Sequence, residues 1–359
     1  MINKNQIDDI LSSYDKSKIE ITTICSHSAL QIFHGARREG FKTIGICTQD
    51  RKQMYDSFPL AKPDEYLILG KFSDILEKKY QNFLIESNSI VVPHGSFVEY
   101  VGPENLEEKF LVPMFGNRKT LKWEGERKKQ REWLQKAGLK LPKQYRTVNE
   151  AEGKVFVKFS GAKGGRGFFT TDSEEDLKKK LKKKISQGII SKADSLTLTI
   201  QEFIPGVRYY IHYFYSPFKN RVEILGMDKR IEPIDDSYRG LPDIPDEFLD
   251  YTVTGNQPVI VRESLLPEVL KMGTNTVKTS MDLFPPGMIG PFCLETIYHP
   301  ERGFTVFEIS ARIVAGTNLY PEGSPYSSYI FEEPMSTGRR IAREINLGIE
   351  NGKLEKVIF

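Results

Sequence analysis

Cysteine is scarce in this sequence, which has only Cys25, Cys47 and Cys293 among its 359 residues. Their number is odd, and they form neither a CxxC pair nor the spacing of metal ligands. The pattern therefore indicates neither a disulfide framework nor a metal site built on cysteine. We expect three reduced side chains that pack in the interior, where lone cysteines are commonly found.

The sequence also lacks an excess of charge of one sign and a long apolar run. Its 51 lysines and arginines nearly balance 48 aspartates and glutamates, so the charge composition does not indicate a polyanionic partner. No segment approaches the roughly 18 apolar residues that span a bilayer, and the start MINKNQIDDI does not resemble a signal peptide. We expect a cytoplasmic protein that binds neither nucleic acid nor membranes and is large enough for two or three packed units.

Between residues 18 and 93, apolar segments rich in β-branched residues alternate with stretches of helical period. This alternation predicts a parallel sheet flanked by helices. Ligands of such sheets bind beyond the carboxyl ends of the strands, so the residues that follow each apolar segment are candidates for a site.

Two of these strand ends carry a serine and a histidine where a helix should begin. They are Ser26 with His27, and His94 with Ser96. One interpretation is that the serines cap helices and the histidines only satisfy hydrogen bonds. The chain has just 5 histidines, however, and finding two at equivalent strand ends favours a binding role. Free N–H groups at a helix start suit a phosphate or carboxylate.

A glycine-rich segment over residues 160–167 lies between two strand-like segments, 155–159 and 168–171. Glycines let backbone N–H groups approach phosphate oxygens, and Lys163 and Arg166 can add charged donors. The segment is neither a Walker A loop nor a dinucleotide fingerprint, because no helix follows it. A flap over a triphosphate fits this pattern, although a long β-turn alone would also contain glycines.

Two neighbouring features strengthen the flap interpretation. Lys158 lies in an apolar strand, where an ammonium is costly unless it is paired, so a nucleotide phosphate is a sensible partner. A solvent-facing lysine is the alternative. Further on, an apolar strand runs into an acidic hinge over residues 202–206, whose backbone can bind an adenine edge.

In the final third, Glu295 and Glu308 lie in two strand-like segments that could pair as a hairpin. Two buried carboxylates side by side should be tolerable only if a cation such as Mg²⁺ holds them. Arg312 should share a strand face with Glu308 and Ser310, where it could neutralise a transferring phosphoryl group. A simple ion pair between Glu308 and Arg312 is the alternative.

Together these motifs resemble the ATP-grasp superfamily and, within it, the formate-dependent synthetases of archaeal purine biosynthesis that make 5-formamidoimidazole-4-carboxamide ribonucleotide (FAICAR). The resemblance covers nearly the whole chain and is carried by SIVVPHGSF, LVPMFGNR, VKFSGAKGGRG, IHYFYSP, LGMDKR, VTGNQPV, RESLLP, PPGMIGPFCLE and GRRIARE.

The resemblance implies an α/β (α+β) ATP-grasp fold in three parts. Residues 1–123 would form an N-terminal Rossmann-like domain with a parallel sheet. Residues 124–206 would form a lid subdomain with the glycine-rich loop. Residues 207–359 would form a C-terminal domain with a mixed or antiparallel sheet and the metal site.

The resemblance also implies a reaction. Formate would attack the γ-phosphate of ATP to give formyl phosphate, which would formylate the 5-amino group of 5-aminoimidazole-4-carboxamide ribonucleotide (AICAR). The products would be FAICAR, ADP and phosphate, and Mg²⁺ or Mn²⁺ would assist. The family resemblance further suggests a homo-oligomer, with a hexamer as one form.

Taken with the motifs, the resemblance implies these site residues. AICAR would be bound by His27, Ser96 and Asn256. ATP would be bound by Lys158, Lys163, Gly164, Gly165, Arg166, Gly167, Glu202, Phe203, Ile204 and Glu232. The metal ligands would be Glu295 and Glu308. The catalytic residues would be Arg312 and Lys158.

Two positions depart from the family pattern. Glu295 stands where relatives have a glutamine, which should strengthen Mg²⁺ binding, and residues 313–318 replace a second glycine and an acidic residue. This leaves open a paralogue with altered activity or a non-catalytic nucleotide sensor. Another ATP-grasp carboxylate–amine ligase, with a different acid or amine, is the third alternative.

Overall fold

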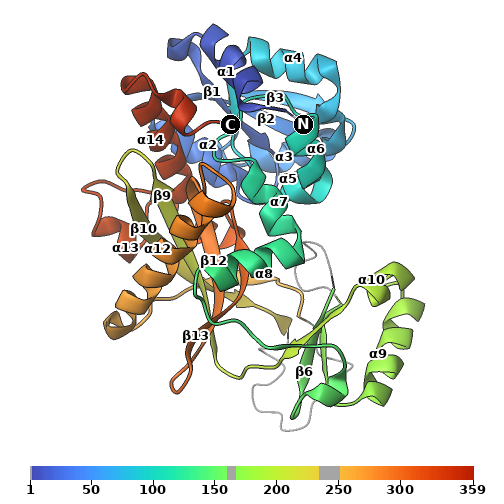
Figure 1. The fold of residues 1–359 in the computed structure, drawn as a ribbon. Helices are drawn as coiled ribbons and strands as arrows, with labels where there is room; N and C mark the ends of the chain where they lie inside the picture. Colours follow the sequence, from blue (N-terminus) through green and yellow to red (C-terminus); the bar gives the residue numbers. More distant parts are fainter. Residues whose placement is uncertain (1, 160–166, 234–250) are drawn as a thin grey trace.

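The computed structural model describes residues 2–159, 167–233 and 251–359, which contain three sheets (Figure 1). The first is a four-stranded parallel sheet in the order β3-β2-β1-β4. Its strands are β1 (Glu20–Ile24), β2 (Lys42–Thr48), β3 (Glu65–Leu69) and β4 (Ser89–Val91). β1, β2 and β4 are buried along most of their length, as expected for a parallel sheet covered on both faces. The predicted parallel sheet is confirmed.

Helices connect and cover these strands. They are α1 (Lys4–Ser13), α2 (Ala29–Arg38), α3 (Gln49–Asp56), α4 (Lys78–Glu86), α5 (Gly95–Tyr100) and α6 (Pro103–Glu108). Helices α2 and α5 begin just beyond the ends of β1 and β4, where helices were predicted. Short 3₁₀ helices along the chain cover Lys16–Lys18, Phe72–Leu76, Val148–Glu150, Glu263–Leu265, Ala315–Leu319 and Leu354–Lys356.

Two further helices lead from this layer to the rest of the molecule, α7 (Lys119–Gly125) and α8 (Arg127–Lys136). The second of them, α8, ends just before Gly138, a glycine with φ of +71°. Trp133 anchors α8, because its ring is fully buried and its Nε1–H donates to the Thr276 carbonyl over 2.9 Å.

The second sheet belongs to a small unit at one side of the molecule (Figure 1). Its strand order is β5-β8-β6-β7, with β5 (Gln144–Tyr145), β6 (Val155–Lys158), β7 (Phe169–Thr171) and β8 (Thr199–Glu202). Helices α9 (Glu174–Ser186) and α10 (Lys192–Leu196) complete the unit. β6 and β7, which precede and follow the glycine-rich segment in the sequence, pair antiparallel, so the two predicted strands are confirmed.

The third sheet has five antiparallel strands in the order β11-β10-β9-β12-β13. The strands are β9 (Val207–Ser216), β10 (Arg221–Ile231), β11 (Gly255–Pro258), β12 (Gly290–His299) and β13 (Gly303–Ser310). The predicted hairpin of the two glutamate segments is confirmed as β12 and β13, with Glu295 directly opposite Glu308.

Alternation along these five strands gives the third sheet two different faces. One face is apolar and packs against α8 and against α12 (Leu266–Leu283), with a core that includes Ile211, Leu294 and Val306. The opposite face carries most of the polar and charged side chains described below. We call it the polar face, meaning Arg208, Tyr210, Asp228, Arg230, Glu232, Asn256, Glu295, Glu308 and Ser310.

The chain's end returns to the first layer. After α13 (Pro325–Ser328), helix α14 (Thr337–Glu350) packs against α2. The two helices approach backbone to backbone, because a Cβ on Gly35 would lie 2.1 Å from the Arg339 nitrogen and one on Gly338 would lie 2.3 Å from the Gln31 carbonyl oxygen. Within the described ranges, no helix is both long enough and apolar enough to cross a bilayer.

Candidate active site

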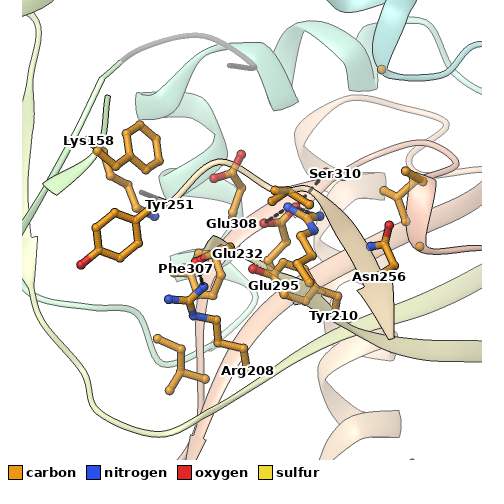
Figure 2. A pocket seen from close by; sticks show the side chains of 18 of the residues that line it. Lys158, Arg208, Tyr210, Glu232, Tyr251, Asn256, Glu295, Phe307, Glu308 and Ser310 are labelled. Atoms are coloured by element: carbon orange, nitrogen blue, oxygen red, sulfur yellow. Dashed lines mark hydrogen bonds and ion pairs between the residues drawn. The ribbon is translucent and has the colours of Figure 1, made fainter. Parts of the chain in front are cut away.

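A cavity of about 580 Å³ lies where the three sheets meet. Its walls come from the ends of β1 and β4, from β6 and the hinge after β8, and from the polar face of the third sheet. Figure 2 shows Glu295 and Tyr210 between Lys158 on one side of the view and Asn256 on the other. Residues more than 200 positions apart in the sequence therefore share one cavity.

Most of the predicted site residues that the structure describes line this cavity. They are His27, Ser96, Lys158, Glu202, Phe203, Ile204, Glu232, Asn256, Glu295, Glu308 and Arg312. Gly167 does not line it; its φ of +83° favours glycine, and its ideal Cβ would lie 2.8 Å from Ile190. The remaining predicted residues, Lys163, Gly164, Gly165 and Arg166, lie outside the described residues.

Each of the three glutamates on the polar face has its own arginine. Glu295 accepts from Arg230 Nη2 at 2.7 Å and from Nη1 at 3.2 Å. Glu308 pairs with Arg127 of α8 at 3.0 Å, and Glu232 pairs with Arg208. The two neighbouring glutamates were expected to need a cation such as Mg²⁺, and in the structure a separate arginine compensates each of them.

The two glutamates nevertheless fit a magnesium site. Mg²⁺ commonly takes one or two carboxylates and completes its shell with water and substrate phosphates. Glu295 and Glu308 are register partners on adjacent strands, and both line the cavity. The described residues contain no group of three or more potential metal ligands, so an ion held here would take other ligands from a bound phosphate or water.

Charge at Glu308 is strongly favoured. Burial alone would raise the pKa of its carboxyl group, but the cations Arg127 and Lys158 outweigh burial and lower the pKa to about 2. Glu308 is thus ionised at neutral pH, as a metal ligand must be.

Lys158 ends β6 and is buried, so the alternative of a solvent-facing lysine is wrong. Its Nζ lies 4.6 Å from the centre of the Phe307 ring. Burial lowers the pKa of Lys158 to about 8, although the nearby Glu308 opposes this shift. A buried ammonium beside the glycine-rich segment is a ready partner for an anionic ligand.

Arg312 follows β13 and does not pair with Glu308, so the ion pair considered as an alternative is wrong. Its Nη2 lies 2.9 Å from Glu124 of α7, whose other carboxylate oxygen accepts from the Ala311 N–H at 2.8 Å. Arg312 also crowds the start of α5, since a Cβ on Gly95 would lie 3.3 Å from its Cζ. Glu124 therefore fixes Arg312 at the wall formed by the strand ends.

The two histidines at the strand ends have different roles. Their rings stack with centroids 5.3 Å apart. His94 is fully buried, uses Nε2 toward the Ile24 carbonyl at 2.9 Å, and accepts from the Ser96 N–H through Nδ1 at 3.2 Å, which caps α5. Burial lowers the pKa of His94 to about 3, so the ring stays neutral. For His94, the interpretation as a satisfied structural histidine is correct.

His27 is placed for a ligand. Its Nδ1 lies 2.7 Å from the Ser28 hydroxyl, and no hydrogen bond within the described part of the chain uses its Nε2. Its backbone has a φ of +54°, unusual for a residue with a side chain. Residues 313–318, which depart from the family pattern, support the loop that contains His27, because Asn318 donates to the His27 carbonyl at 3.1 Å.

The hinge after β8 connects the small unit to the third sheet. Glu202 accepts from the Lys143 N–H at 3.2 Å and pairs with Arg302, in the turn between β12 and β13, at 2.6 Å. The Glu202 side chain is therefore held by structural contacts. The next two residues, Phe203 and Ile204, line the cavity through half-exposed and buried side chains, respectively.

Asn256 belongs to a buried polar chain. Its Nδ2 donates to Asp228 Oδ2 at 2.7 Å, and Asp228 Oδ1 lies 2.6 Å from His212 Nε2. Because Asp228 takes one hydrogen of the amide NH₂ group, Asn256 can offer a ligand its amide oxygen and its second N–H.

Sequence analysis missed four prominent side chains of the cavity: Arg127, Arg208, Tyr210 and Arg230. Arg208 could have been found, because it is a cation in a strand with apolar neighbours, the signal that identified Lys158, whereas Arg230 lies among the charged residues Asp228, Lys229 and Glu232. Arg127 lies in a helix crowded with charge, where no single arginine is distinctive.

Comparisons with known proteins agree on one group of relatives. Residues 176–359 match the family model "Domain of unknown function (DUF1297)", and residues 21–145 match "Protein of unknown function (DUF1246)". A protein of Korarchaeum cryptofilum named 5-formaminoimidazole-4-carboxamide-1-(beta)-D-ribofuranosyl 5'-monophosphate synthetase is 50% identical over all of both chains.

One solved structure supports the same grouping, and a second shares the fold. An IMP biosynthesis protein PurP from Thermococcus kodakaraensis superposes with a TM-score of 0.76 at 35% identity and covers 94% of this chain and 100% of its own. An ADP complex of N5-carboxyaminoimidazole ribonucleotide synthetase has a TM-score of 0.63 at 13% identity, covering 91% and 76% of the two chains. The predicted ATP-grasp fold is confirmed by these neighbours.

Proposed function

The chain belongs to the family of 5-formaminoimidazole-4-carboxamide-1-(beta)-D-ribofuranosyl 5'-monophosphate synthetases, and we propose that it is the ATP- and formate-dependent ligase that makes FAICAR from AICAR. The observation that carries this proposal is the shared cavity: Lys158, Glu295, Glu308 and His27 line one space, although they come from three different sheets or their loops. A ligase that joins two small substrates at the expense of ATP needs such a meeting point.

The chemistry has two steps. A formate oxygen attacks the γ-phosphorus of ATP, the bond to the bridging oxygen breaks, and ADP leaves with that oxygen. The AICAR amine then attacks the carbon of formyl phosphate, the carbon–oxygen bond to phosphate breaks, and the nitrogen loses a proton. FAICAR and phosphate are the products.

The residues at the phosphate end suit the first step. Phosphoryl transfer depends on positioning and on neutralising charge, and it needs no covalent nucleophile. We assign Lys158 to the phosphates and Glu295 and Glu308 to the metal ion. Bound there, Mg²⁺ or Mn²⁺ would supply positive charge against the charge that develops on the phosphates.

The strand ends suit the second step. We assign His27, Ser96 and Asn256 to AICAR and Arg312 to the phosphoryl group as it departs. Desolvation by the surrounding wall of the cavity, together with the nearby His94 and Arg312, keeps the pKa of His27 well below its usual 6.5, so His27 offers a neutral ring nitrogen. The adenine of ATP is assigned to the hinge after β8, with Glu232 as a further nucleotide contact.

Formate is a weakly held substrate in this scheme. It has three non-hydrogen atoms, so a ceiling of about 1.5 kcal/mol per atom limits its binding to about 4.5 kcal/mol, or roughly millimolar affinity. Formyl phosphate would hydrolyse in open water, so we assign the glycine-rich segment a second role in excluding solvent.

The finer parts of the proposal remain predictions. They are the domain limits 1–123, 124–206 and 207–359, the homo-oligomer with a hexamer as one form, the choice between Mg²⁺ and Mn²⁺, and the cytoplasmic location.

One mixture tests the function. Purified protein with ATP, Mg²⁺, formate and AICAR should yield FAICAR and ADP in equal amounts, measured by chromatography. Leaving out any one component should stop both products. ADP release that ignores AICAR, or acylation of AICAR by acetate or an amino acid in place of formate, would point to a different ligase. Nucleotide binding without turnover would point to a sensor.

A further inference from the structure

Arg230 lies at the centre of the polar face. On strand β10 it is the register partner of Asn256 in β11, the residue assigned to AICAR. Its guanidinium also reaches Glu295, the residue assigned to the metal, with Nη2 to Oε1 at 2.7 Å and Nη1 to Oε2 at 3.2 Å. Arg230 therefore lies between the groups that would hold the two partners of the reaction.

The contact with Glu295 does not use all the hydrogen-bond donors of Arg230. A guanidinium has five N–H groups, and the two hydrogen bonds to Glu295 use one hydrogen on each Nη. In residues 2–159, 167–233 and 251–359, no acceptor takes the Nε–H or the second hydrogen of either Nη. The side chain is 21% exposed and lines the cavity, so these donors are available to a ligand.

Aromatic rings fix the position of this guanidinium. The Arg230 Cζ lies 3.9 Å from the centre of the Tyr210 ring, which is edge-on to Phe307 at 6.2 Å. Lys158 lies over that second ring at 4.6 Å. Arg230 and Lys158 thus rest on two adjacent rings. Lys158, which is assigned to phosphate, is therefore a neighbour of Arg230, which has unused donors (Figure 2 shows the rings and Lys158).

The other arginines of the cavity are less suited to a small acid. Arg312 is bound by Glu124, and its Nε is buried. Arg127 pairs with Glu308 on the phosphate side, and Arg208 pairs with Glu232, which is assigned to the nucleotide.

We propose that Arg230, resting on Tyr210, binds the carboxylate substrate of the reaction through the donors that Glu295 leaves free. The inference rests on the proposed function, in which this substrate is formate. A carboxylate has to place one oxygen at the γ-phosphate and its carbon near the amine of AICAR, and Arg230 lies between the residues assigned to these groups. The planar fork of arginine matches a carboxylate better than any other side chain.

The test compares the formate KM of the wild type with that of Arg230→Lys and Arg230→Gln at saturating ATP, AICAR and Mg²⁺. Lysine keeps the charge beside Glu295 but loses the fork, so the formate KM should rise about tenfold; glutamine should raise it about a hundredfold. The KM values of ATP and AICAR should change less than threefold.

Arg208→Lys is the matched control, since it changes the same residue type on the neighbouring strand. It should raise the KM of ATP and leave that of formate within threefold. Direct binding provides a second readout: saturation-transfer NMR of the formate proton, with a non-hydrolysable ATP analogue and Mg²⁺, should give a signal in the wild type that Arg230→Lys weakens. If Arg230→Gln does not fold, the formate KM and the NMR signal of Arg230→Lys alone test the proposal.

The outcomes separate the two claims. A wild type that makes no FAICAR from formate overturns the proposed function. An active wild type whose Arg230→Lys variant keeps its formate KM within twofold overturns the carboxylate site alone. The same holds if Arg230→Lys raises only the Mg²⁺ requirement or only the AICAR KM, because Arg230 would then merely position Glu295 or Asn256.

Discussion

Two regions meet in the cavity, and they hold their polar groups in different ways. At the ends of β1 and β4, His27 and His94 stack as neutral rings, and backbone groups hold His94 in place. On the polar face of the third sheet, charged side chains hold one another, as Arg230 holds Glu295. The strand ends are therefore suited to recognise one substrate by shape and hydrogen bonds, whereas the polar face is suited to manage phosphate charge. Changes to the charged side chains on the phosphate side should affect turnover and ATP binding most. Changes at the strand ends should affect only the binding of one substrate or the stability of the fold.

The largest effect is expected from Glu308→Gln on the polar face. The substitution keeps the shape of the side chain but removes one of the two negative charges assigned to the metal, so kcat should fall about 100-fold or more. The circular dichroism spectrum should stay unchanged. Glu301→Gln, in the exposed turn of the same hairpin, is the control and should keep full activity. Wild-type turnover in Glu308→Gln would contradict the assignment of Glu308 to a metal ion.

A pH titration tests the charge of Lys158. Because burial lowers the pKa of this group to about 8, the ammonium is lost as pH rises through 8. The Kd of ATP should therefore rise about tenfold between pH 7 and pH 9, as measured by calorimetry. Lys158→Arg keeps its charge over this range and should flatten the profile. A flat profile in the wild type would mean that Lys158 does not bind the phosphates.

At the strand ends, His27→Ala should affect one substrate only. Loss of a neutral ring contact should raise the KM of AICAR about tenfold, while the Kd of ATP stays within twofold. Since the ring is neutral, the KM of AICAR in the wild type should show no inflection near pH 6.5. His299→Ala, at the end of β12, serves as a histidine control. Equal losses for both substrates in His27→Ala would contradict its assignment to AICAR.

The smallest effect concerns stability at His94. Its folded pKa of about 3 lies below the usual 6.5, so below pH 6.5 the unfolded chain binds a proton that the folded chain does not. Stability should therefore decline as pH falls from 6.5 toward 3, and His94 should contribute about 1 kcal/mol of that loss between pH 7 and pH 5.5. Urea unfolding of His94→Gln should show a shallower decline. Identical slopes in variant and wild type would contradict the neutral, capping role.

Much of the fold could be predicted because its signals are local. Alternating apolar segments predicted the parallel sheet, and the glycine-rich segment predicted the β6–β7 pair. Two strand-like segments in the final third predicted the hairpin that brings Glu295 opposite Glu308. Family membership was predictable as well, because the matching strings run along nearly the whole chain.

The partners of the charged residues could not be predicted in this way. Arg230 meets Glu295 across β9, which lies between their strands in the sheet order, and that order cannot be derived from periodicity. Arg312 pairs with Glu124 of α7, 188 positions earlier in the chain. His94 could be told from His27 only when the end of β4 was seen beside the Ile24 carbonyl. These contacts depend on how distant elements pack.

The most direct test of the account follows the oxygen atoms of formate. With formate labelled by ¹⁸O at both oxygens, passage through formyl phosphate should leave one labelled oxygen in the released phosphate and one in the formyl group of FAICAR, as read by mass spectrometry. Released phosphate that carries no label, in a reaction that still makes FAICAR, would contradict the activation of a carboxylate by ATP in this cavity.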